Sequence, residues 1–308
     1  MLGPTDLELA IFRTLCWFSV FEMPLTRFEI WKWLLVPSRA YDLLEVDQAL
    51  SASPWLSHRV CETQGMYTLK ASPISLYLQE RHRRFLDATR KFYKLRRACA
   101  FFRAVPDVEA VAAANTLSWW HTTEQSDIDL YIITKPNRIW SSRFFLVLPF
   151  LIMGHRPHHA HDIPIRDPFC FSFFSTTNAL QLETYKWNSQ DYYLAYWVKS
   201  LVPMFDRASV LAHLSALNKW ADGMLPNARP RVEHPVHRSL RTPKLPIQWS
   251  VLEPLFRSLQ RNRFPRVLRE LANKDTRVVI TDETLKFHEN DRREQFLQRF
   301  EDAYQRHL

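Results

Sequence analysis

Glycine is scarce in this chain, with 4 residues among 308, where average usage of about 7% would give roughly 22. The four, Gly3, Gly65, Gly154 and Gly223, lie far apart. A Rossmann fingerprint or a P-loop needs clustered glycines, because a Cβ would keep the backbone from approaching a phosphate. The sequence therefore excludes both of these nucleotide-binding loops.

The chain also lacks paired cysteines and long apolar runs. Its 4 cysteines form no Cys-x-x-Cys pair, which argues against a zinc ribbon or a disulfide scaffold and fits a reducing compartment. The longest apolar run covers residues 144–153, whereas a membrane-spanning helix needs about 20 residues. Asp6 and Glu8 stand where a signal peptide would be basic. We expect a soluble, cytoplasmic protein without a membrane span.

The excess positive charge lies in two segments. The formal net charge is +9, and residues 76–104 contribute +7 while residues 226–274 contribute +8. The remaining segments are slightly acidic. Basic segments of this kind are either solvated helix faces or surfaces for a polyanion. Nucleic acid or another polyanion is therefore a possible partner, through 81–97 and 229–274.

The first 75 residues predict a small helical domain that ends in a hairpin. We expect helices over 7–18, 26–35 and 41–51, and a hairpin over 60–69 with its turn at Gln64-Gly65. The second helix opens with a capping box, Thr26-x-x-Glu29. This is the order of a winged helix. Its third helix carries Asp42, Glu45 and Asp47 and no Lys or Arg, which disfavours DNA reading and a role as a transcription regulator.

The rest of the chain predicts a mixed core followed by a helical region. Apolar periodicity indicates helices over 76–103, 137–153, 190–202, 208–221 and 251–273, a terminal helix from 291, and strands over 108–113, 128–133, 169–174 and 277–280. Residues 227–248 contain four prolines and form a linker or crossing segment. A His-rich stretch at 155–161 lacks a spaced second half for a metal site and is interpreted as a loop.

Asp127 and Asp129 stand at the head of an apolar strand, with Ile128 between them. Residues two apart on a strand share a face. Two carboxylates in this position can hold a pair of Mg²⁺ ions, which clamp the attacking and leaving oxygens of a phosphoryl displacement. The alternative is a solvated Asp-x-Asp at the end of a strand.

The residues upstream of Asp127 carry a family resemblance. A short apolar strand is followed by Asn115-Thr116-Leu117-Ser118, about eleven residues before the Asp-x-Asp. This arrangement resembles the nucleotidyltransferase superfamily of DNA polymerase β, in which a strand, a Gly-Ser pair at a helix start and a later Asp-x-Asp form the site. It is more similar still to a bacterial group with an N-terminal winged helix, whose acidic motif runs Ser-Asp-Ile-Asp-Leu before an apolar strand ending in Thr-Lys. Residues 126–130 and 132–135 match that pattern as they stand.

Other segments resemble the same group. They are Leu25-Thr26 with Glu29-Ile30, Asn218 and Trp220 with Pro226-Asn227, and residues 285–288 with 290–293. The resemblance implies an α+β fold with a winged helix over 1–75, a nucleotidyltransferase-type core with a small mixed sheet over 76–225, and a helical C-terminal region over 226–308. It also implies Mg²⁺-dependent (or Mn²⁺-dependent) transfer of a nucleoside monophosphate from an NTP to an acceptor.

The resemblance assigns a role to individual residues. Asp127 and Asp129 are the expected metal ligands and catalytic acids. Asn115, Thr116, Ser118 and Ser126 are the expected phosphate contacts. Arg143 or the basic helix 81–97 is a candidate for neutralising phosphate charge.

Two departures from the family pattern favour a second hypothesis. Asn115-Thr116 stands where the family has Gly-Ser, although Asn tolerates a left-handed backbone and Thr keeps a hydroxyl. A third carboxylate is expected on the strand 169–174, whose centre is Ser172; Asp162 or Asp167 would have to reach the site from the preceding loop. The alternative function is a catalytically silent nucleotidyltransferase fold that acts as an adaptor or nucleic-acid-binding subunit.

Overall fold

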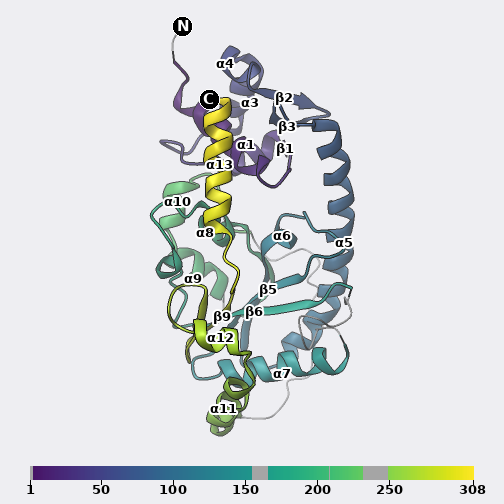
Figure 1. The fold of residues 1–308 in the computed structure, drawn as a ribbon, viewed down its shortest axis with the longest axis vertical. Helices are drawn as coiled ribbons and strands as arrows, with labels where there is room; N and C mark the ends of the chain where they lie inside the picture. Colours follow the sequence, from purple (N-terminus) through teal and green to yellow (C-terminus); the bar gives the residue numbers. More distant parts are fainter. Residues whose placement is uncertain (1–2, 155–165, 208, 232–248) are drawn as a thin grey trace.

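The protein is a mixed α+β chain with two sheets. The computed structural model describes residues 3–154, 166–207, 209–231 and 249–308, so Asp162 and the His-rich stretch 155–161 lie outside the described residues. A small antiparallel sheet has the order β1-β3-β2, and a mixed six-stranded sheet has the order β7-β4-β5-β6-β9-β8. Figure 1 shows the N-terminal elements at one end of the molecule, the large sheet near its middle, and helix α11 (Glu253–Arg263) at the other end.

The N-terminal elements follow the predicted order of helices and hairpin. They are α1 (Asp6–Ser19), β1 (Leu25–Thr26), α2 (Arg27–Lys32), α3 (Leu43–Ala52), α4 (Pro54–Ser57), β2 (Val60–Thr63) and β3 (Met66–Leu69). The Thr26–Glu29 capping box is present. Helix α2 ends three residues earlier than the periodicity predicted, because the Leu35 amide donates to the hydroxyl of Thr14 on α1 (2.9 Å) rather than continuing the helix.

Helix α5 (Ile74–Ala104) connects the N-terminal elements to the large sheet and runs along one side of the molecule (Figure 1). Its buried residues recur at helical spacing, with Ala88, Phe92, Leu95 and Cys99 in one core cluster. The helix therefore packs one stripe against the sheet along its second half.

The large sheet contains more strands than the sequence predicted. Strands β4 (Val108–Ala113), β5 (Ile128–Thr134) and β6 (Phe169–Thr176) are joined by the unpredicted β7 (Val202–Asp206) and β9 (Thr284–Phe287), and β8 covers Val278–Ile280. Strand β7 contains Pro203, which argues against a strand interior but is tolerated because β7 lies at the edge of the sheet. Strands β5 and β6 are parallel, whereas β4 and β7 are antiparallel to their neighbours.

Side-chain alternation along β5 divides the core into two layers. Ile128, Leu130 and Ile132 pack on the side covered by α5, α7 (Ile139–Ile152) and α11. Tyr131 and Ile133 pack on the other side, under α8 (Tyr192–Ser200) and α9 (Val210–Leu217).

Two predicted helices are interrupted for identifiable reasons. The helix expected over 208–221 breaks at Asn218 into α9 and α10 (Trp220–Met224); the Asn218 side chain accepts from Leu182 N (2.8 Å) and donates to Leu180 O (2.7 Å). The helix expected over 251–273 breaks at Pro265, which has no amide hydrogen, into α11 and α12 (Arg266–Leu271), after a 3₁₀ turn η2 (Trp249–Leu252). A second 3₁₀ turn, η1, covers Glu183–Tyr185.

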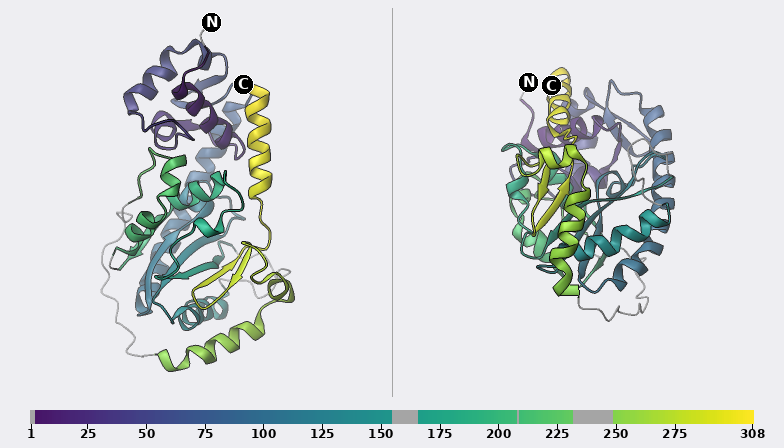
Figure 2. Two further views of the ribbon diagram at one scale, coloured as in Figure 1. Left: turned by 90° about the vertical axis from the view of Figure 1, so that its left-hand side faces the viewer. Right: turned by 60° about the horizontal axis from the view of Figure 1, so that its bottom comes forward.

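The C-terminal helix α13 (Arg293–His307) returns to the N-terminal elements (Figure 2, left). Phe300 on α13 meets Trp17 on α1 edge to face, with ring centroids 5.8 Å apart. The two ends of the chain therefore share one apolar cluster. None of the helices in the described part of the chain combines the length and the apolar character that crossing a bilayer requires.

Candidate functional site

The two acidic residues of the Asp-x-Asp motif lie at the beginning of β5. Asp127 precedes the strand and is exposed, whereas Asp129 is its second residue and is partly buried. Burial raises the pKa of Asp129 to about 6, and the nearby charge of Asp127 acts in the same direction. The two carboxylates therefore act on one another, as their spacing predicted.

Asn115 is the first residue of α6 (Asn115–Ser118), the short helix that follows β4, and it contacts Asp129. Its side chain hydrogen-bonds to the Asp129 carboxylate, which lowers the pKa of that acid against the effect of burial. Its Oδ1 accepts from the indole Nε1 of Trp197 on α8 (3.0 Å). One residue earlier, the Ala114 amide donates to the backbone oxygen of Asp129 (3.1 Å). The side chain thus bridges β5 and α8.

The backbone of Asn115 has the conformation for which the family uses glycine. Its φ is +50°, in the left-handed region, which Asn tolerates better than most residues. The sequence places at this position a residue type that tolerates this geometry, and the backbone of Asn115 adopts it.

The other predicted phosphate contacts differ from one another. Thr116 is exposed beside Asn115. Ser118 is fully buried; its hydroxyl donates to Asn115 O (2.8 Å) and lies 3.1 Å from Ser200 Oγ, and this burial argues against its predicted phosphate contact. Ser126 Oγ accepts from the Thr123 amide (2.9 Å) and closes the turn before β5. Of these three hydroxyls, Thr116 is the one placed to meet a ligand.

A third carboxylate does not join Asp129 from the described residues. Cys170 on β6 pairs in register with Asp129, and its side chain hydrogen-bonds to that carboxylate. Ser172, expected at this position, lies two residues further along and contacts His288 Nε2 (3.3 Å). Asp167 is buried and forms a bidentate ion pair with Arg90 on α5. Its carboxylate is therefore committed to holding α5 against the core.

The donors near the Asp-x-Asp motif can be compared with what a divalent ion requires. Mg²⁺ is commonly held by one or two carboxylates and completes its shell with water and substrate phosphate. In the described part of the chain, no three His, Cys, Asp or Glu side chains gather closely enough to hold a metal. The thiol of Cys170 is a soft ligand that Mg²⁺ disfavours. Asp127 and Asp129 therefore offer two carboxylates as oxygen donors for a divalent ion.

The basic helix 81–97 is less available to a polyanion than its sequence indicated. Lys91 is completely buried and donates to Asp87 (2.9 Å), while Arg90 binds Asp87 and Asp167. Arg81 pairs with Glu29 on α2 (2.5 Å). Much of the positive charge that marked this segment therefore docks α5 onto the protein.

Arg143 is also committed inside the protein. It is buried on α7, donates to Gln260 on α11 (2.6 Å), and lies over the rings of Phe264 and Phe287. Its expected role in neutralising phosphate charge is therefore wrong.

A pocket with several basic side chains in its lining lies beside Asn115, and it was not predicted from the sequence. It has a volume of about 260 Å³ and is lined by Asn115, Lys286, His288, Arg292 and Arg293 among others. Burial lowers the pKa of Lys286 to about 8 and that of His288 to about 3, so the imidazole is neutral at physiological pH. The sequence signal was present in the motif resemblance of residues 285–288 and 290–293.

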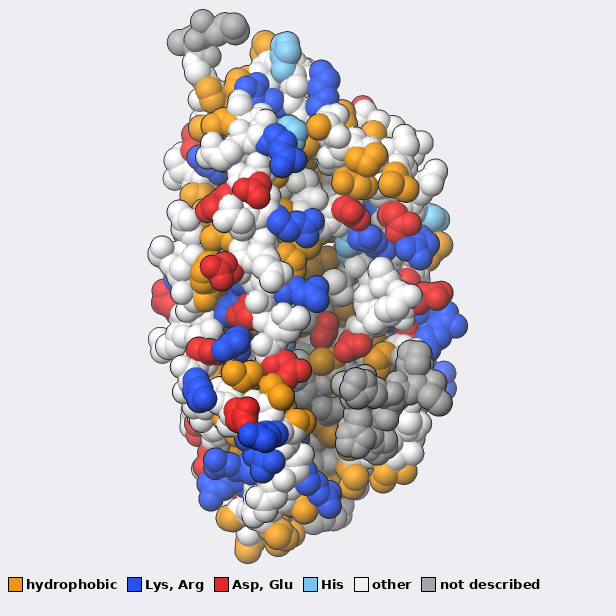
Figure 3. Space-filling model, viewed as in Figure 1, with side chains coloured by type: hydrophobic (Ala, Val, Ile, Leu, Met, Phe, Trp, Pro, Cys, Tyr) orange, Lys and Arg blue, Asp and Glu red, His pale blue; other side chains and the backbone are white. Residues whose placement is uncertain are grey.

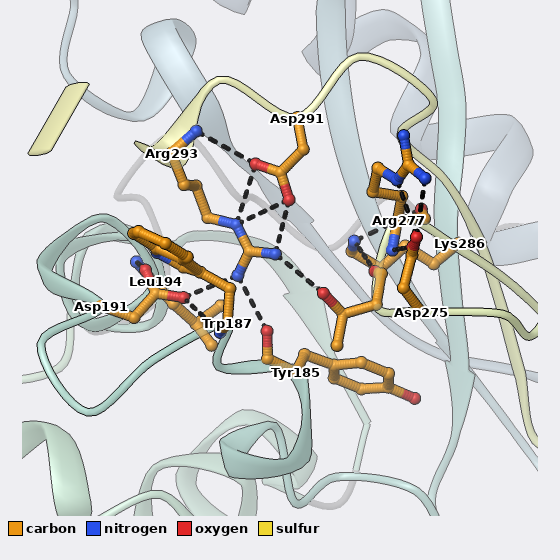
Figure 4. A network of polar contacts seen from close by, with 10 residues as sticks. Tyr185, Trp187, Asp191, Leu194, Asp275, Arg277, Lys286, Asp291 and Arg293 are labelled. Carbon is orange, nitrogen blue, oxygen red and sulfur yellow. Dashed lines mark hydrogen bonds and ion pairs between the residues drawn. The ribbon is translucent and has the colours of Figure 1, made fainter. Parts of the chain in front are cut away.

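Arg293 holds this pocket together (Figure 4). Its guanidinium donates to Asp191 (2.6 Å), to Asp291 (2.6 Å), to the Tyr185 backbone oxygen (2.8 Å) and to Thr276 (3.0 Å). Asp191 in turn caps α8 by accepting from the Leu194 amide (2.9 Å). This network fixes the start of α13 against the helix that carries Trp197.

An aromatic pocket opens on the other side of Asn115. It has a volume of about 160 Å³, and its main walls are Trp17, Phe21, Trp119, Tyr193, Trp197 and Phe296, with Thr116 and His121 also in its lining. Asn115, Tyr193, Trp197 and Phe296 line both pockets. Figure 3 shows this face of the molecule hollowed near its middle, with apolar side chains inside the hollow and acidic side chains beside it.

The chain has no significant match among known proteins. No protein-family model matches it, no curated protein is significantly similar, and no solved structure is significantly similar. The nucleotidyltransferase resemblance therefore stays a prediction that rests on the motif residues.

Proposed function

We propose that the chain binds an NTP together with Mg²⁺ or Mn²⁺ at Thr116, Asp127 and Asp129, and transfers the nucleoside monophosphate to an acceptor. One observation carries this proposal: Asn115 follows β4 in a left-handed conformation and is hydrogen-bonded to Asp129 on the neighbouring strand. On this proposal, the N-terminal elements are a winged helix and the six-stranded sheet is a nucleotidyltransferase-type core.

The proposed roles follow from the position of each side chain. Asp127 and Asp129 would hold the cation, which when bound neutralises charge on the phosphates. The exposed hydroxyl of Thr116 would donate to a phosphate oxygen. Asn115 acts as a positioning residue, because it fixes the carboxylate of Asp129 from one side while Trp197 fixes the carboxamide. Asp129 must be ionised to hold a cation, so binding should weaken as pH falls below about 6.

Calorimetric titration with the four NTPs, with and without Mg²⁺ or Mn²⁺, tests the proposal. We expect binding that requires both NTP and cation, and its loss in Asp127→Asn with Asp129→Asn. Asp302→Asn on the exposed face of α13 is a matched control that should bind as the wild type does. Cation-dependent binding retained in the double variant would remove the metal role. In the wild-type protein, release of pyrophosphate when an acceptor is added would distinguish turnover from binding alone.

A catalytically silent adaptor or nucleic-acid-binding subunit is the second candidate. It is favoured by the ion pair between Asp167 and Arg90 and by the thiol of Cys170 opposite Asp129. The exposed cations Arg261 and Arg263 on α11 offer a surface for a polyanion within 229–274.

Fluorescence anisotropy with single-stranded RNA and duplex DNA tests this second function. Binding should weaken steeply with salt, and Arg261→Gln with Arg263→Gln should lower the logarithmic salt slope by about one for each arginine that binds a phosphate. Arg306→Gln at the far end of α13 is the control. Binding that is indifferent to Mg²⁺ and to Asp127→Asn would favour the adaptor; failure to bind either nucleic acid would exclude its nucleic-acid-binding form.

A further inference from the structure

We propose that the aromatic pocket binds a flat aromatic ring. The inference rests on the proposed function, under which the ring is either the base of the NTP or an aromatic group of the acceptor. Nothing in the sequence motif accounts for this pocket, because its walls come from four separate parts of the chain: α1 and the turn after it, the loop after β4, α8 and α13.

The size and walls of the pocket fit one ring. Its volume is about 160 Å³, and a cavity of roughly 150 Å³ accommodates a benzene molecule. Trp17, Trp119 and Trp197 are among the aromatic residues that line it. Stacking on such surfaces is a general way to hold a base, because every base has a π-face.

The walls are fixed before any ligand arrives. Trp17 is stacked on Tyr196, with ring centroids 5.5 Å apart and an interplanar angle of 11°. The Tyr196 hydroxyl donates to Trp33 O (3.0 Å). Tyr193 is stacked on Phe296 at 5.6 Å and 19°. A ring that enters the pocket therefore requires little ordering of side chains, which favours binding.

The pocket adjoins the proposed phosphate site. Asn115 and Thr116 are in its lining, and the same Asn115 side chain hydrogen-bonds to Asp129. The Trp197 indole forms part of the wall and also donates to Asn115 Oδ1. A molecule with an aromatic ring and a phosphate group can therefore engage both sites at once.

His121 adds a neutral polar side chain to the lining of the pocket. The side chain is buried, and burial together with the charge of Arg84 lowers its pKa to about 4, so it is neutral at physiological pH. Its Nε2 contacts Arg84 and the Phe21 backbone oxygen, whereas its buried Nδ1 has no hydrogen-bond partner among the described residues. The pocket therefore has an uncharged imidazole beside its aromatic walls.

Calorimetry on the full chain tests the proposal with four probes. They are Mg²⁺-tripolyphosphate, each Mg²⁺-NTP, each free nucleoside, and N-acetyl-tyrosinamide titrated with and without saturating Mg²⁺-NTP. Base stacking should make at least one NTP bind roughly 5- to 150-fold more tightly than tripolyphosphate. If the base fills the pocket, the NTP should exclude N-acetyl-tyrosinamide; if an acceptor ring fills it, N-acetyl-tyrosinamide should bind alongside the NTP.

Two variants decide whether any such binding occurs in the pocket. Phe296→Ala and Phe21→Ala each remove one partly buried wall, and either should weaken ring binding about fivefold or more. Phe28→Ala, at an exposed phenylalanine on α2 outside the pocket, is the matched control and should leave it unchanged. Circular dichroism identifies any variant that fails to fold, in which case the other variant provides the test.

The outcomes separate this inference from the proposed function. Ring binding that is lost in the wall variants but not in Phe28→Ala supports the pocket. The inference is overturned if the NTPs, the nucleosides and N-acetyl-tyrosinamide all bind no more tightly than tripolyphosphate, or if they bind the wall variants as tightly as the wild type. This holds even when Mg²⁺-tripolyphosphate binds. If no phosphate ligand binds, the proposed function fails, and the ring probe still decides the pocket by the same criterion.

Discussion

Replacing Asn115 with glycine introduces the residue that stands at the matching place in the nucleotidyltransferase pattern this chain resembles, yet we expect it to destabilise this protein. The substitution deletes the hydrogen bond to the Asp129 carboxylate and leaves the Trp197 indole N–H, 3.0 Å from Asn115 Oδ1, without its acceptor. It also relieves a left-handed backbone, because φ at Asn115 is +50°.

The magnitudes favour a net destabilisation. A hydrogen bond to a charged group contributes about 1.5–3 kcal/mol, and a neutral one about 1 kcal/mol. Relief of the left-handed conformation returns about 1 kcal/mol at most for Asn. Glycine at 115 should therefore lower the free energy of unfolding by about 2 kcal/mol. Because the Asn115 hydrogen bond lowers the pKa of Asp129, the substitution should also raise that pKa further.

Urea denaturation at pH 7 measures the first effect, with Asn137→Gly as the control. Asn137 is exposed and also has a left-handed backbone, with φ of +57°, but its side chain makes no hydrogen bond within the described residues. Its replacement should leave stability unchanged or raise it slightly. An Asn115→Gly protein as stable as the wild type would refute the bridging role of the carboxamide.

Three further predictions follow from ionisable groups. Burial raises the pKa of Asp129 from 3.8 to about 6, so the folded protein without metal holds this proton more tightly than the unfolded chain does. The free energy of unfolding should therefore fall as pH rises through 4–6. Asp129→Asn should remove this pH-dependent component and raise the free energy of unfolding at pH 7 by about 3 kcal/mol, as measured by urea denaturation over a pH series. Asp167→Asn should lower stability by roughly 2 kcal/mol, since it removes one of the two carboxylates that pair with Arg90, and should not alter cation-dependent NTP binding measured by calorimetry; abolished NTP binding in a folded variant would restore Asp167 as a site acid. Arg293→Met should cost roughly 3–5 kcal/mol, because Asp191 is buried opposite it, and a thermal melt near that of the wild type would contradict the structural role.

Motif residues outside the acidic strand have a structural explanation that the sequence could not provide. Asn218 belongs to a segment that resembles the family, and its side chain satisfies backbone groups where α9 gives way to α10. Asn227 donates to Tyr41 O (2.7 Å) and accepts from Tyr41 N (3.2 Å), which ties the segment after α10 to the N-terminal elements. Such hydrogen bonds join residues far apart along the chain, so local pattern alone does not reveal them.

The charge pattern illustrates the same limit. The sequence located the basic segment of α5, but it gave no sign that Lys91 would be completely buried or that Arg90 would meet Asp167, 77 residues away. A linear sequence records the number of charges and not their partners. Only packing decides which cations face solvent and which hold two elements together.

What the sequence determined by itself was local: the alternation that begins at Ile128 and the placement of Asp127 and Asp129 at the head of a strand. Each depends on near neighbours and on intrinsic preferences of the residue type. The tertiary structure decided that Cys170 rather than an acid stands opposite Asp129, and that α1, α8 and α13 enclose an aromatic pocket beside it. These outcomes depend on strand register and on packing between distant segments, which are set by how the whole core assembles.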